Sequence, residues 1–317
     1  MSRLFRDVES GCRYPRGSVV CIGAFDGLHL GHQALVRHAV ARARALDLPA
    51  LALSFEPLPR EYFAPAAPPP RLLMPRAKVD GLLDLGADAV GLLRFDARLS
   101  AMSGEDFVRR VLLQGLQVRE VWVGPDFRFG KARDGDIALL QRIGGECGFT
   151  ASEITPVQVD GTRVSSTRIR ALLQTGDFAA AARLLGRPYA IGGRVVRGKQ
   201  LGRTLGYPTA NVRLAGKVPA LSGIYATRVH GLDDAGPRAS VSSLGTRPTV
   251  DGVEPLLEAH LFDFDGDLYG RRIEVEFVAK LRDEARFTDL EALTAQMHHD
   301  AAQARAILMH THQRAFA

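Results

Sequence analysis

The first half of the chain alternates between short apolar runs and longer stretches with helical spacing. The apolar runs are rich in Val, Ile, Leu or Phe and cover residues 18–22, 48–55, 87–95, 119–124 and 151–157. Between them, apolar positions recur at helical spacing over residues 32–46, 76–85 and 103–114. Strands that alternate with helices in this way predict an α/β fold, in which a parallel sheet carries helices on both faces.

The second half of the chain shows short strands separated by turns. Between residues 191 and 280 the strand-like runs are RVV, ANVRL, GIYATRVH, ASVSSLG, LLEAHLFDF and RIEVEFVAKL, and Gly, Pro and Asp interrupt them. Short strands with frequent turn residues are typical of an antiparallel β-barrel or sandwich. We expect an antiparallel β-barrel in this region.

One helix is predicted to close the chain. Thr288 and Glu291 form the S/T-x-x-E pattern of a capping box, and apolar residues recur at helical spacing from Leu290 onward. The Pro-rich stretch APAAPPPR, residues 64–71, predicts a stiff, exposed loop. Because the pattern changes near Gly186, we expect two domains. They cover residues 1–185 and residues 186–317.

Composition excludes several classes of protein. The 41 Lys and Arg against 35 Asp and Glu give a net charge of +6 without a block of like charges, which suits small polyanions such as nucleotides. Cys12, Cys21 and Cys147 are widely separated and contain no C-x-x-C pair, so we expect neither a disulfide framework nor a zinc site. No apolar run approaches the ~18 residues of a membrane helix, and no apolar signal segment opens the chain. We therefore expect a cytoplasmic protein without a membrane partner.

The stretch GAFDGLHLGH, Gly23 to His32, follows the first long apolar run and leads into a predicted helix. A glycine-rich turn before a helix offers free backbone N–H groups and the positive end of the helix dipole, which together bind phosphate. His29 and His32 add N–H donors that can hold a phosphate while it undergoes substitution. A metal bound by H-x-x-H is disfavoured, since no third ligand stands at a suitable spacing.

This stretch resembles the G-x-F-D-G-x-H-x-G-H signature of the nucleotidyltransferase superfamily. The superfamily's second signature is expected near the end of the domain, where RVSSTRIR, residues 163–170, is found. The resemblance implies a Rossmann-like domain in which one phosphate attacks the α-phosphate of a nucleoside triphosphate and pyrophosphate leaves. His29 and His32 would steady the α-phosphate. The other implied ATP- or phosphate-binding residues are Gly23, Phe25, Asp26, Gly31, Ser165, Ser166, Thr167, Arg168 and Arg170.

From the residues alone, Ser165, Ser166 and Thr167 are candidate N-caps of a helix through RIRALLQ. Their hydroxyls, the helix dipole and the nearby arginines would meet where the leaving phosphates lie. The alternative is an ordinary capped helix with a basic face.

The stretch VGPDFRFGKARDGD, residues 123–136, follows the fourth predicted strand. Asp126 at the end of this strand could accept hydrogen bonds from a flavin imide or an adenine amino group, and Phe127 and Phe129 could stack on a ring. The two phenylalanines fit a hydrophobic core equally well. We name all three as candidate flavin-binding residues.

In the second domain, the residues Gly193 through Gly198 and Lys199 have the spacing of a P-loop. Gln200 replaces the required Ser or Thr, and the following residues do not form a helix, so a P-loop is excluded. The same region resembles the riboflavin kinase family, whose barrel carries a glycine-rich segment followed by G-[FY]-P-T-A-N. GYPTAN, residues 206–211, matches that motif in full.

Thr209 and Asn211 are two residues apart, so on a strand they face the same way and could complete a Mg²⁺ site beside the phosphates of ATP. The resemblance implies that Glu258, in LEAHLFDFDGDLYG, takes the proton of the riboflavin 5′-hydroxyl. It further implies that ATP is bound near Gly193, Gly198 and Gly202. Arg247 in SLGTRPTV is a candidate phosphate or flavin contact.

Together the two halves resemble the bacterial bifunctional riboflavin kinase/FAD synthetase family over nearly the whole chain. The resemblance implies an enzyme that phosphorylates riboflavin to FMN and then adenylylates FMN to FAD, with riboflavin, FMN and ATP as its small-molecule partners. Ala24 and Leu58 depart from residues common in the family, where a polar residue and a histidine occur.

Two other functions fit part of the pattern. One is an enzyme that retains a single activity, and the other is a non-catalytic flavin- or nucleic-acid-binding regulator. The retention of His29, His32 and Glu258 argues against a regulator. The predicted barrel strands lack a row of exposed aromatic residues for base stacking, so no nucleic-acid partner is expected.

Overall fold

The computed structural model describes residues 3–8, 11–198, 202, 205–232, 236–249 and 252–313. Its contacts group the chain into two compact units. The first unit comprises residues 1–69 and 75–166, and the second comprises residues 70–74 and 167–317. The predicted boundary at residues 185/186 thus differs from the boundary of the compact units, which lies after Ser166.

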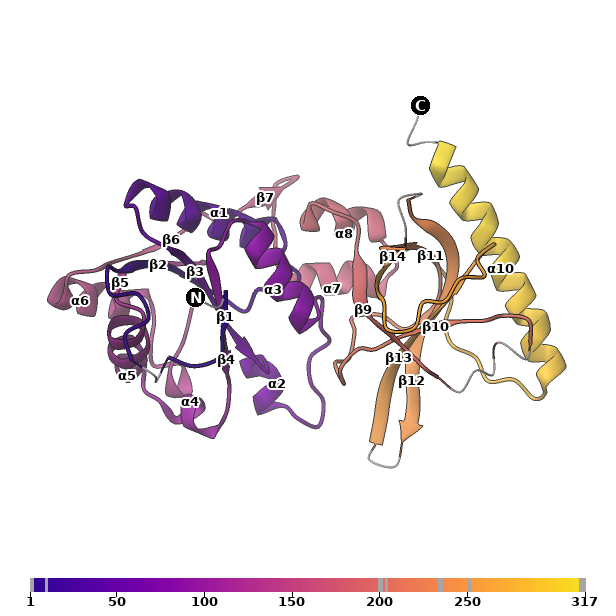
Figure 1. Cartoon of the computed structure of the whole chain (residues 1–317), viewed down its shortest axis with the longest axis horizontal. Coiled ribbons are helices and arrows are strands. Elements are labelled where there is room, and N and C mark those ends of the chain that lie inside the picture. Colours follow the sequence, from indigo (N-terminus) through magenta and orange to yellow (C-terminus); the bar gives the residue numbers. More distant parts are fainter. Residues whose placement is uncertain are drawn as a thin grey trace. The chain divides into compact units, whose positions relative to one another are not determined.

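The first unit is built on a parallel sheet with the strand order β1-β4-β3-β2-β5-β6 (Figure 1). Its strands are β1 (Leu4–Phe5), β2 (Ser18–Ile22), β3 (Ala50–Glu56), β4 (Ala89–Arg94), β5 (Val118–Val123) and β6 (Thr150–Glu153). All neighbouring strands in it are parallel. The five strands predicted from apolar runs are confirmed, and the short strand β1 is an addition at one edge.

Helices connect these strands on both faces of the sheet. They are α1 (Leu30–Ala45), α2 (Pro59–Phe63), α3 (Pro75–Asp84), α4 (Ala97–Ala101), α5 (Gly104–Asp106), the π-helix Phe107–Gly115, the 3₁₀ turn Lys131–Arg133 and α6 (Ile137–Cys147). The helix predicted over residues 103–114 is divided between α5 and the π-helix. π-Helices are rare and usually short, which is why helical spacing alone does not reveal one.

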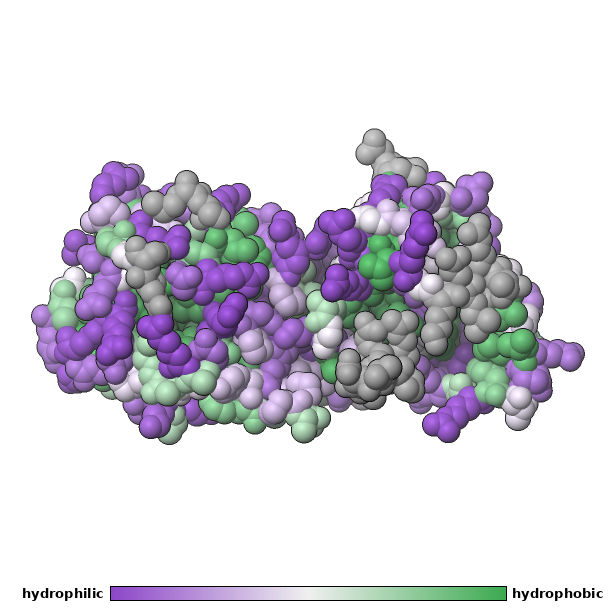
Figure 2. Space-filling view, turned by 60° about the horizontal axis from the view of Figure 1, so that its bottom comes forward, coloured by the Kyte–Doolittle hydropathy of each residue, from purple (hydrophilic) through white to green (hydrophobic). Residues whose placement is uncertain are grey.

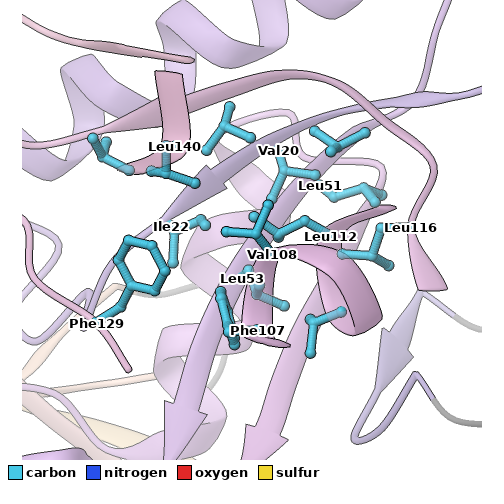
Figure 3. Close-up of a cluster of buried hydrophobic side chains, with 14 of the residues drawn as sticks. Val20, Ile22, Leu51, Leu53, Phe107, Val108, Leu112, Leu116, Phe129 and Leu140 are labelled. Atoms are coloured by element: carbon cyan, nitrogen blue, oxygen red, sulfur yellow. The ribbon is translucent and has the colours of Figure 1, made fainter. Parts of the chain in front are cut away.

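The core of the first unit lies between the sheet and the π-helix. Val20 and Ile22 from β2 and Leu53 from β3 point toward Val108 and Leu112 of the π-helix (Figure 3). All of these side chains are almost completely buried. On the opposite face of β2, burial raises the pKa of the Cys21 thiol to about 12, so this cysteine is an inert core residue at neutral pH.

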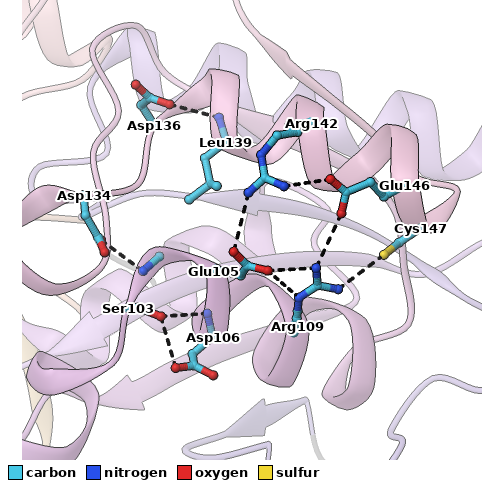
Figure 4. A network of polar contacts seen from close by, with 11 residues as sticks. Ser103, Glu105, Asp106, Arg109, Asp134, Asp136, Leu139, Arg142, Glu146 and Cys147 are labelled. Atoms are coloured by element: carbon cyan, nitrogen blue, oxygen red, sulfur yellow. Dashed lines mark hydrogen bonds and ion pairs between the residues drawn. The ribbon is translucent and has the colours of Figure 1, made fainter.

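A network of exposed ion pairs joins α5 and the π-helix to α6 (Figure 4). Arg109 lies 2.8 Å from Glu105 and 3.4 Å from Glu146, while Arg142 lies 2.7 Å from Glu146 and 3.5 Å from Glu105. Their side chains are 42–52% exposed, so solvent screens each pair and the network adds little to the stability of the core.

The chain then passes through a short hairpin and two helices before it enters the barrel. The hairpin is formed by β7 (Gln158–Val159) and β8 (Thr162–Arg163), and the helices are α7 (Ser166–Gln174) and α8 (Phe178–Leu185). The barrel strands are β9 (Ala190–Val196), β10 (Ala210–Val212), β11 (Gly223–His230), β12 (Arg238–Thr249), β13 (Gly252–Leu261) and β14 (Arg272–Arg282). Every pair in their closed order, β10-β13-β12-β11-β14-β9, is antiparallel, as predicted.

The last helix, α10 (Leu290–Gln313), packs along the outside of the barrel (Figure 1). The predicted capping box at Thr288 and Glu291 is replaced by a cap at Asp289. The Asp289 carboxylate accepts a hydrogen bond from the Ala292 amide at 2.8 Å, and the Thr288 hydroxyl donates to the same carboxylate at 2.9 Å. A carboxylate one residue nearer to the helix reaches the free amides of the first turn, and it interacts favourably with the helix dipole.

The Pro-rich loop is exposed only over its first part, residues 64–67. Residues 70–74 pack within the second unit, where the Arg71 amide donates to the Val218 carbonyl at 2.7 Å. The Arg170 Nε donates to the Pro70 carbonyl, also at 2.7 Å. The end of the loop is therefore anchored by hydrogen bonds to its backbone N–H and C=O groups.

No helix within the described ranges is both long and apolar enough to cross a membrane. Figure 2 shows one face, on which hydrophilic side chains surround small apolar groups. The large hydrophobic side chains that are exposed are scattered along the described chain, at Leu46, Phe63, Tyr269, Leu290 and Met309.

The core and the ion-pair network predict losses of stability of very different size for mutations in the same helix. Leu112→Ala should reduce the free energy of unfolding of the first unit by about 2–5 kcal/mol, because it leaves a cavity in a fully buried position. Arg109→Ala should cost less than about 1 kcal/mol, since its ion pairs are exposed. Urea unfolding followed by the fluorescence of Trp122, which is the chain's one tryptophan and lies in β5, measures both. If both variants lost the same free energy of unfolding, the conclusion that the buried core contributes more stability than the exposed ion pairs would be wrong.

Candidate functional site

The first candidate site is the turn between β2 and α1, which contains the GAFDGLHLGH stretch. β2 lies between β3 and β5 in the middle of the sheet, so the turn emerges at the carboxyl edge, where parallel α/β sheets bind ligands. Phe25, Gly27 and Leu28 have positive φ values of 49°, 97° and 44°. Phe25 and Leu28 carry side chains that rarely adopt this conformation, and both are buried. Burial of these side chains therefore holds the turn in a strained backbone conformation.

The other candidate residues of this turn are also engaged in its structure. The Gly23 amide donates to the Leu53 carbonyl at 3.1 Å, so this N–H belongs to the sheet. Asp26 is 3% exposed. A Cβ at Gly31 would lie 3.3 Å from the His29 ring, so the missing side chain leaves this ring its space.

His29 and His32 form a stacked pair at the start of α1. Their ring centroids are 3.7 Å apart with an interplanar angle of 14°, and the Phe25 ring meets His32 edge-on at 5.4 Å. His29 is the N-cap of α1, and its Nδ1 accepts a hydrogen bond from the His32 amide at 3.3 Å. Because Nδ1 accepts this bond, Nε2 is the ring nitrogen of His29 that carries a proton.

His32 is held in the neutral form. Burial of its ring lowers its pKa well below the usual 6.5, and the positive charges of His29 and Lys78 lower it further. Its Nδ1 is buried and has no hydrogen-bond partner among the described residues. At neutral pH His32 is therefore a neutral N–H donor.

The second sequence motif contacts the first through Ser166. The Ser166 hydroxyl donates to the Asp26 carbonyl at 2.8 Å, although 140 residues separate them. α7 starts at Ser166, so the N-cap position falls on Ser165, and Ser166 and Thr167 lie within the first turn of the helix. The prediction that all three cap the helix is thus corrected. Thr167, Arg168 and Arg170 fall in the second compact unit, where the Arg170 Nε binds the Pro70 carbonyl.

The candidate flavin-binding loop follows β5. Asp126 is exposed, has a φ of 64° and forms an ion pair with Arg163 at 2.8 Å. Phe129 is 8% exposed and belongs to the core of the first unit, and Phe127 stacks on it at 5.4 Å. Phe129 thus has the packing role that the sequence left open, while Phe127 keeps a partly exposed ring.

The second candidate site is a cavity of about 440 Å³ in the barrel unit. Three residues singled out in the sequence, Thr209, Asn211 and Glu258, all line it. Asn211 and Glu258 are directly paired across β10 and β13, so their side chains lie on the same face of the sheet. A threonine, an asparagine and a glutamate therefore line one cavity.

The glycines of the second domain have different positions. Gly202 lines the cavity, and its carbonyl accepts a hydrogen bond from the Tyr207 amide at 2.7 Å. A Cβ at Gly198 would lie 2.5 Å from the Asn211 Oδ1, so this glycine allows Asn211 its place. Gly193 is paired with Ile273 inside the barrel wall. The backbone of Arg247 lies in β12, but its side chain is outside the described residues.

A further wall of the cavity comes from residues that the sequence analysis missed. Asp300 of α10 is 4% exposed, and its carboxylate accepts three hydrogen bonds from Arg282, at 3.0, 3.1 and 2.7 Å. The Tyr207 hydroxyl lies 2.6 Å from His298 Nδ1, and its ring meets that of His260 at 4.8 Å. Tyr207 is part of GYPTAN and could have been noticed there. Arg282 and Asp300 give no local signal, because their pairing depends on the docking of α10.

Comparison with known proteins identifies two families in this one chain. The model of the FAD synthetase family matches residues 12–168, and that of the riboflavin kinase family matches residues 185–308. The bifunctional riboflavin kinase/FMN adenylyltransferase of Escherichia coli (strain K12) is 43% identical over 304 residues, which cover 96% of this chain and 97% of that protein. The protein of the same name from Pseudomonas fluorescens is 46% identical over 293 residues, which cover 92% of this chain and 93% of that protein.

The chain belongs to the bifunctional riboflavin kinase/FMN adenylyltransferase family. Among solved structures, the crystal structure named as a macrolide-efflux protein from Streptococcus pneumoniae is similar, with a TM-score of 0.75 and 29% identity. It covers 94% of this chain and 97% of that chain. The likeness therefore extends through both halves.

The two departures from the common residues of this family lie at different depths. Ala24 is exposed, and its carbonyl accepts a hydrogen bond from the Ser54 hydroxyl at 3.1 Å. Leu58 is 6% exposed and starts α2, where its amide donates to Glu61 at 3.0 Å. Residue 24 is therefore held through its backbone carbonyl and not through its side chain. Leu58 places an apolar side chain in the interior.

Proposed function

We propose that this chain makes FAD from riboflavin in two steps. The barrel unit transfers the γ-phosphoryl group of ATP to riboflavin and gives FMN. The sheet unit transfers the AMP group of a second ATP to FMN and gives FAD and pyrophosphate. The single observation that carries the first assignment is the cavity that gathers Thr209, Asn211 and Glu258. The second assignment is supported by the stacked His29 and His32 at the carboxyl edge of the sheet.

In the kinase step, Glu258 acts as the general base. Its carboxylate takes the proton of the riboflavin 5′-hydroxyl, the oxygen attacks the γ-phosphorus, and ADP leaves with the electrons of the broken P–O bond. Glu258 lines the same cavity as Thr209 and Asn211, which supports a role beside the phosphates.

Thr209 and Asn211 would hold Mg²⁺ with their side-chain oxygens. Their donor set fits a hard cation, since hydroxyl and amide oxygens are ligands that Mg²⁺ accepts. Within the described ranges, no group of three or more His, Cys, Asp or Glu side chains could hold a metal. This suits a cation that shares its ligands with the substrate phosphates and neutralises their charge when bound. ATP would lie against Gly193, Gly198 and Gly202.

In the adenylyl step, an oxygen of the FMN phosphate attacks the α-phosphorus of ATP, and the bond to the β-phosphate oxygen breaks. His29 and His32 donate N–H groups to the α-phosphate oxygens, on which charge gathers. Gly23, Phe25, Asp26 and Gly31 shape the turn. The segment Ser165–Arg170 would hold the departing pyrophosphate with hydroxyl and guanidinium groups.

Flavin binding in the first domain is assigned to Asp126 and Phe127, with Phe129 as the support for the ring of Phe127. Arg247 is a candidate contact for the flavin or phosphate of the second domain. We retain residues 1–185 and 186–317 as the two functional domains. A cytoplasmic location is favoured by three free thiols at Cys12, Cys21 and Cys147.

His32→Ala should abolish FAD formation from FMN and ATP, with a loss of about 100-fold or more, because a donor to the charged transition state is removed. The same protein should still convert riboflavin to FMN at the wild-type rate, because that step uses the barrel cavity. Chromatographic separation of riboflavin, FMN and FAD measures both steps. His38→Ala, at an exposed position of the same helix, is the matched control. Loss of both steps in His32→Ala would contradict the two-site assignment.

Glu258→Gln should lower FMN formation by about 100-fold or more, since general base catalysis is lost while the shape of the side chain is kept. When FMN is supplied directly, FAD formation should be unchanged. Glu274→Gln, at an exposed position on β14, is the control. A Glu258→Gln protein that phosphorylates riboflavin at the normal rate would remove Glu258 from the role of base.

Asn211→Ala should raise the Mg²⁺ concentration needed for half-maximal FMN formation, because one oxygen ligand is lost. Asn211→Asp keeps an oxygen at that position and should need less Mg²⁺ than the alanine variant. The measurement is a Mg²⁺ titration of FMN formation at constant ATP, with FAD formation from supplied FMN as a check that the chain is intact. Identical Mg²⁺ requirements in all three proteins would place the metal elsewhere.

A further inference from the structure

A buried lysine lies beneath the turn that carries the histidine pair. Lys78, on α3, has no exposed surface. Lysine is almost never fully buried, because removing its charge from water costs several kcal/mol unless polar partners compensate. The resemblance to the nucleotidyltransferase superfamily did not include this residue, and its position in α3 gave no signal in the sequence.

Hydrogen bonds connect Lys78 to the backbone of the turn. The Lys78 Nζ donates to the Ser54 Oγ at 3.3 Å, and the Ser54 hydroxyl donates to the Ala24 carbonyl at 3.1 Å. Ser54 lies on β3 and is completely buried. The ammonium group is thus one side chain away from the backbone of the GAFDGLHLGH turn.

α3 approaches the turn at a second point, one helical turn after Lys78. A Cβ at Gly81 would lie 2.6 Å from the Leu28 Cδ1. The missing side chain therefore lets Leu28, with its positive φ of 44°, pack against the helix. Lys78 and Gly81 are three residues apart, so they share a face of α3.

The charge of Lys78 also acts on His32. Together with His29, it is one of the two charged groups that disfavour protonation of His32. Within the part of the chain that the structure describes, the Nδ1 of His32 is buried without a hydrogen-bond partner. The charges that surround the buried His32 ring therefore include the ammonium group of Lys78, which reaches the turn through Ser54.

We propose that Lys78 is a positioning residue of the adenylyl transfer step, whose buried ammonium group fixes the histidine turn through Ser54 and supplies positive charge beside His32. The proposal rests on the proposed function of the first domain. Lys78 is buried beneath the turn, so its positive charge does not fill the space where ATP and FMN would bind. A positive charge at this place suits a reaction that gathers negative charge on the phosphate oxygens.

The test uses Lys78→Met, which keeps an unbranched apolar chain and removes the charge, and Lys78→Arg, which keeps the charge. We expect kcat for FAD formation from FMN and ATP to fall by about 10-fold to 100-fold in Lys78→Met. Arg76→Met is the matched control, since Arg76 is 64% exposed on the same helix and pairs with Asp80. Urea unfolding followed by Trp122 fluorescence verifies that the first unit of each variant is folded.

The second readout is the protonation of His32, which a purely structural role would not change. The imidazole signals of the nine histidines are followed by NMR between pH 8 and pH 4.5, and the His32 signal is identified by its absence in His32→Gln. Removal of a neighbouring positive charge makes the imidazolium less unfavourable, so the midpoint of His32 moves to higher pH in Lys78→Met. Arg76→Met and Lys78→Arg keep the wild-type midpoint.

Both changes are required. A wild-type kcat in Lys78→Met, or an unchanged His32 midpoint in that variant, overturns the proposal. The two failures are distinguishable from failure of the proposed function, because the NMR titration needs no catalysis. If the wild-type protein itself makes no FAD, the assignment of adenylyl transfer fails, and with it the proposed role of Lys78.

Discussion

Two hydroxyl groups hold the backbone of the histidine turn in place. Ser54 of β3 donates to the Ala24 carbonyl, and Ser166 of α7 donates to the Asp26 carbonyl. These bonds attach the turn to the neighbouring strand on one side and to the second motif on the other. A turn with φ values of 49° and 44° at non-glycine residues persists only where its surroundings define it, and here the two hydroxyls and the buried Phe25 do so.

The barrel cavity depends on the register of an antiparallel sheet in the same way. Asn211 is opposite Glu258 because β10 and β13 pair at those residues, and a shift of one residue would turn Glu258 to the other face. Closure of the barrel through β9 and β10 leaves no free edge at which that register could slip. The bond between Arg282 and the buried Asp300 then holds α10 as a wall of the cavity.

Much of the fold and of both candidate sites could be predicted from local sequence. The strand at residues 18–22 and the barrel strands could be predicted because short apolar runs and turn residues follow one another regularly there. The π-helix and the Asp289 cap could not be predicted in this way. Both depend on which backbone groups form hydrogen bonds, and the spacing of apolar residues is the same for either pattern of bonds. Phe129 could be assigned to the core only when its neighbours from the π-helix were known.

The amino-acid sequence by itself determined which residues are candidates for the chemistry: the histidine turn, the SSTRIR segment, the GYPTAN motif and Glu258 all stand in short, recognisable stretches. The tertiary structure alone decided which residues support them. Lys78 reaches Ser54, and Arg282 reaches Asp300, only after helices far along the chain have docked. The physical reason is that a motif is defined by spacing along the backbone, whereas burial, pKa and pairing are properties of the groups that folding brings together in space.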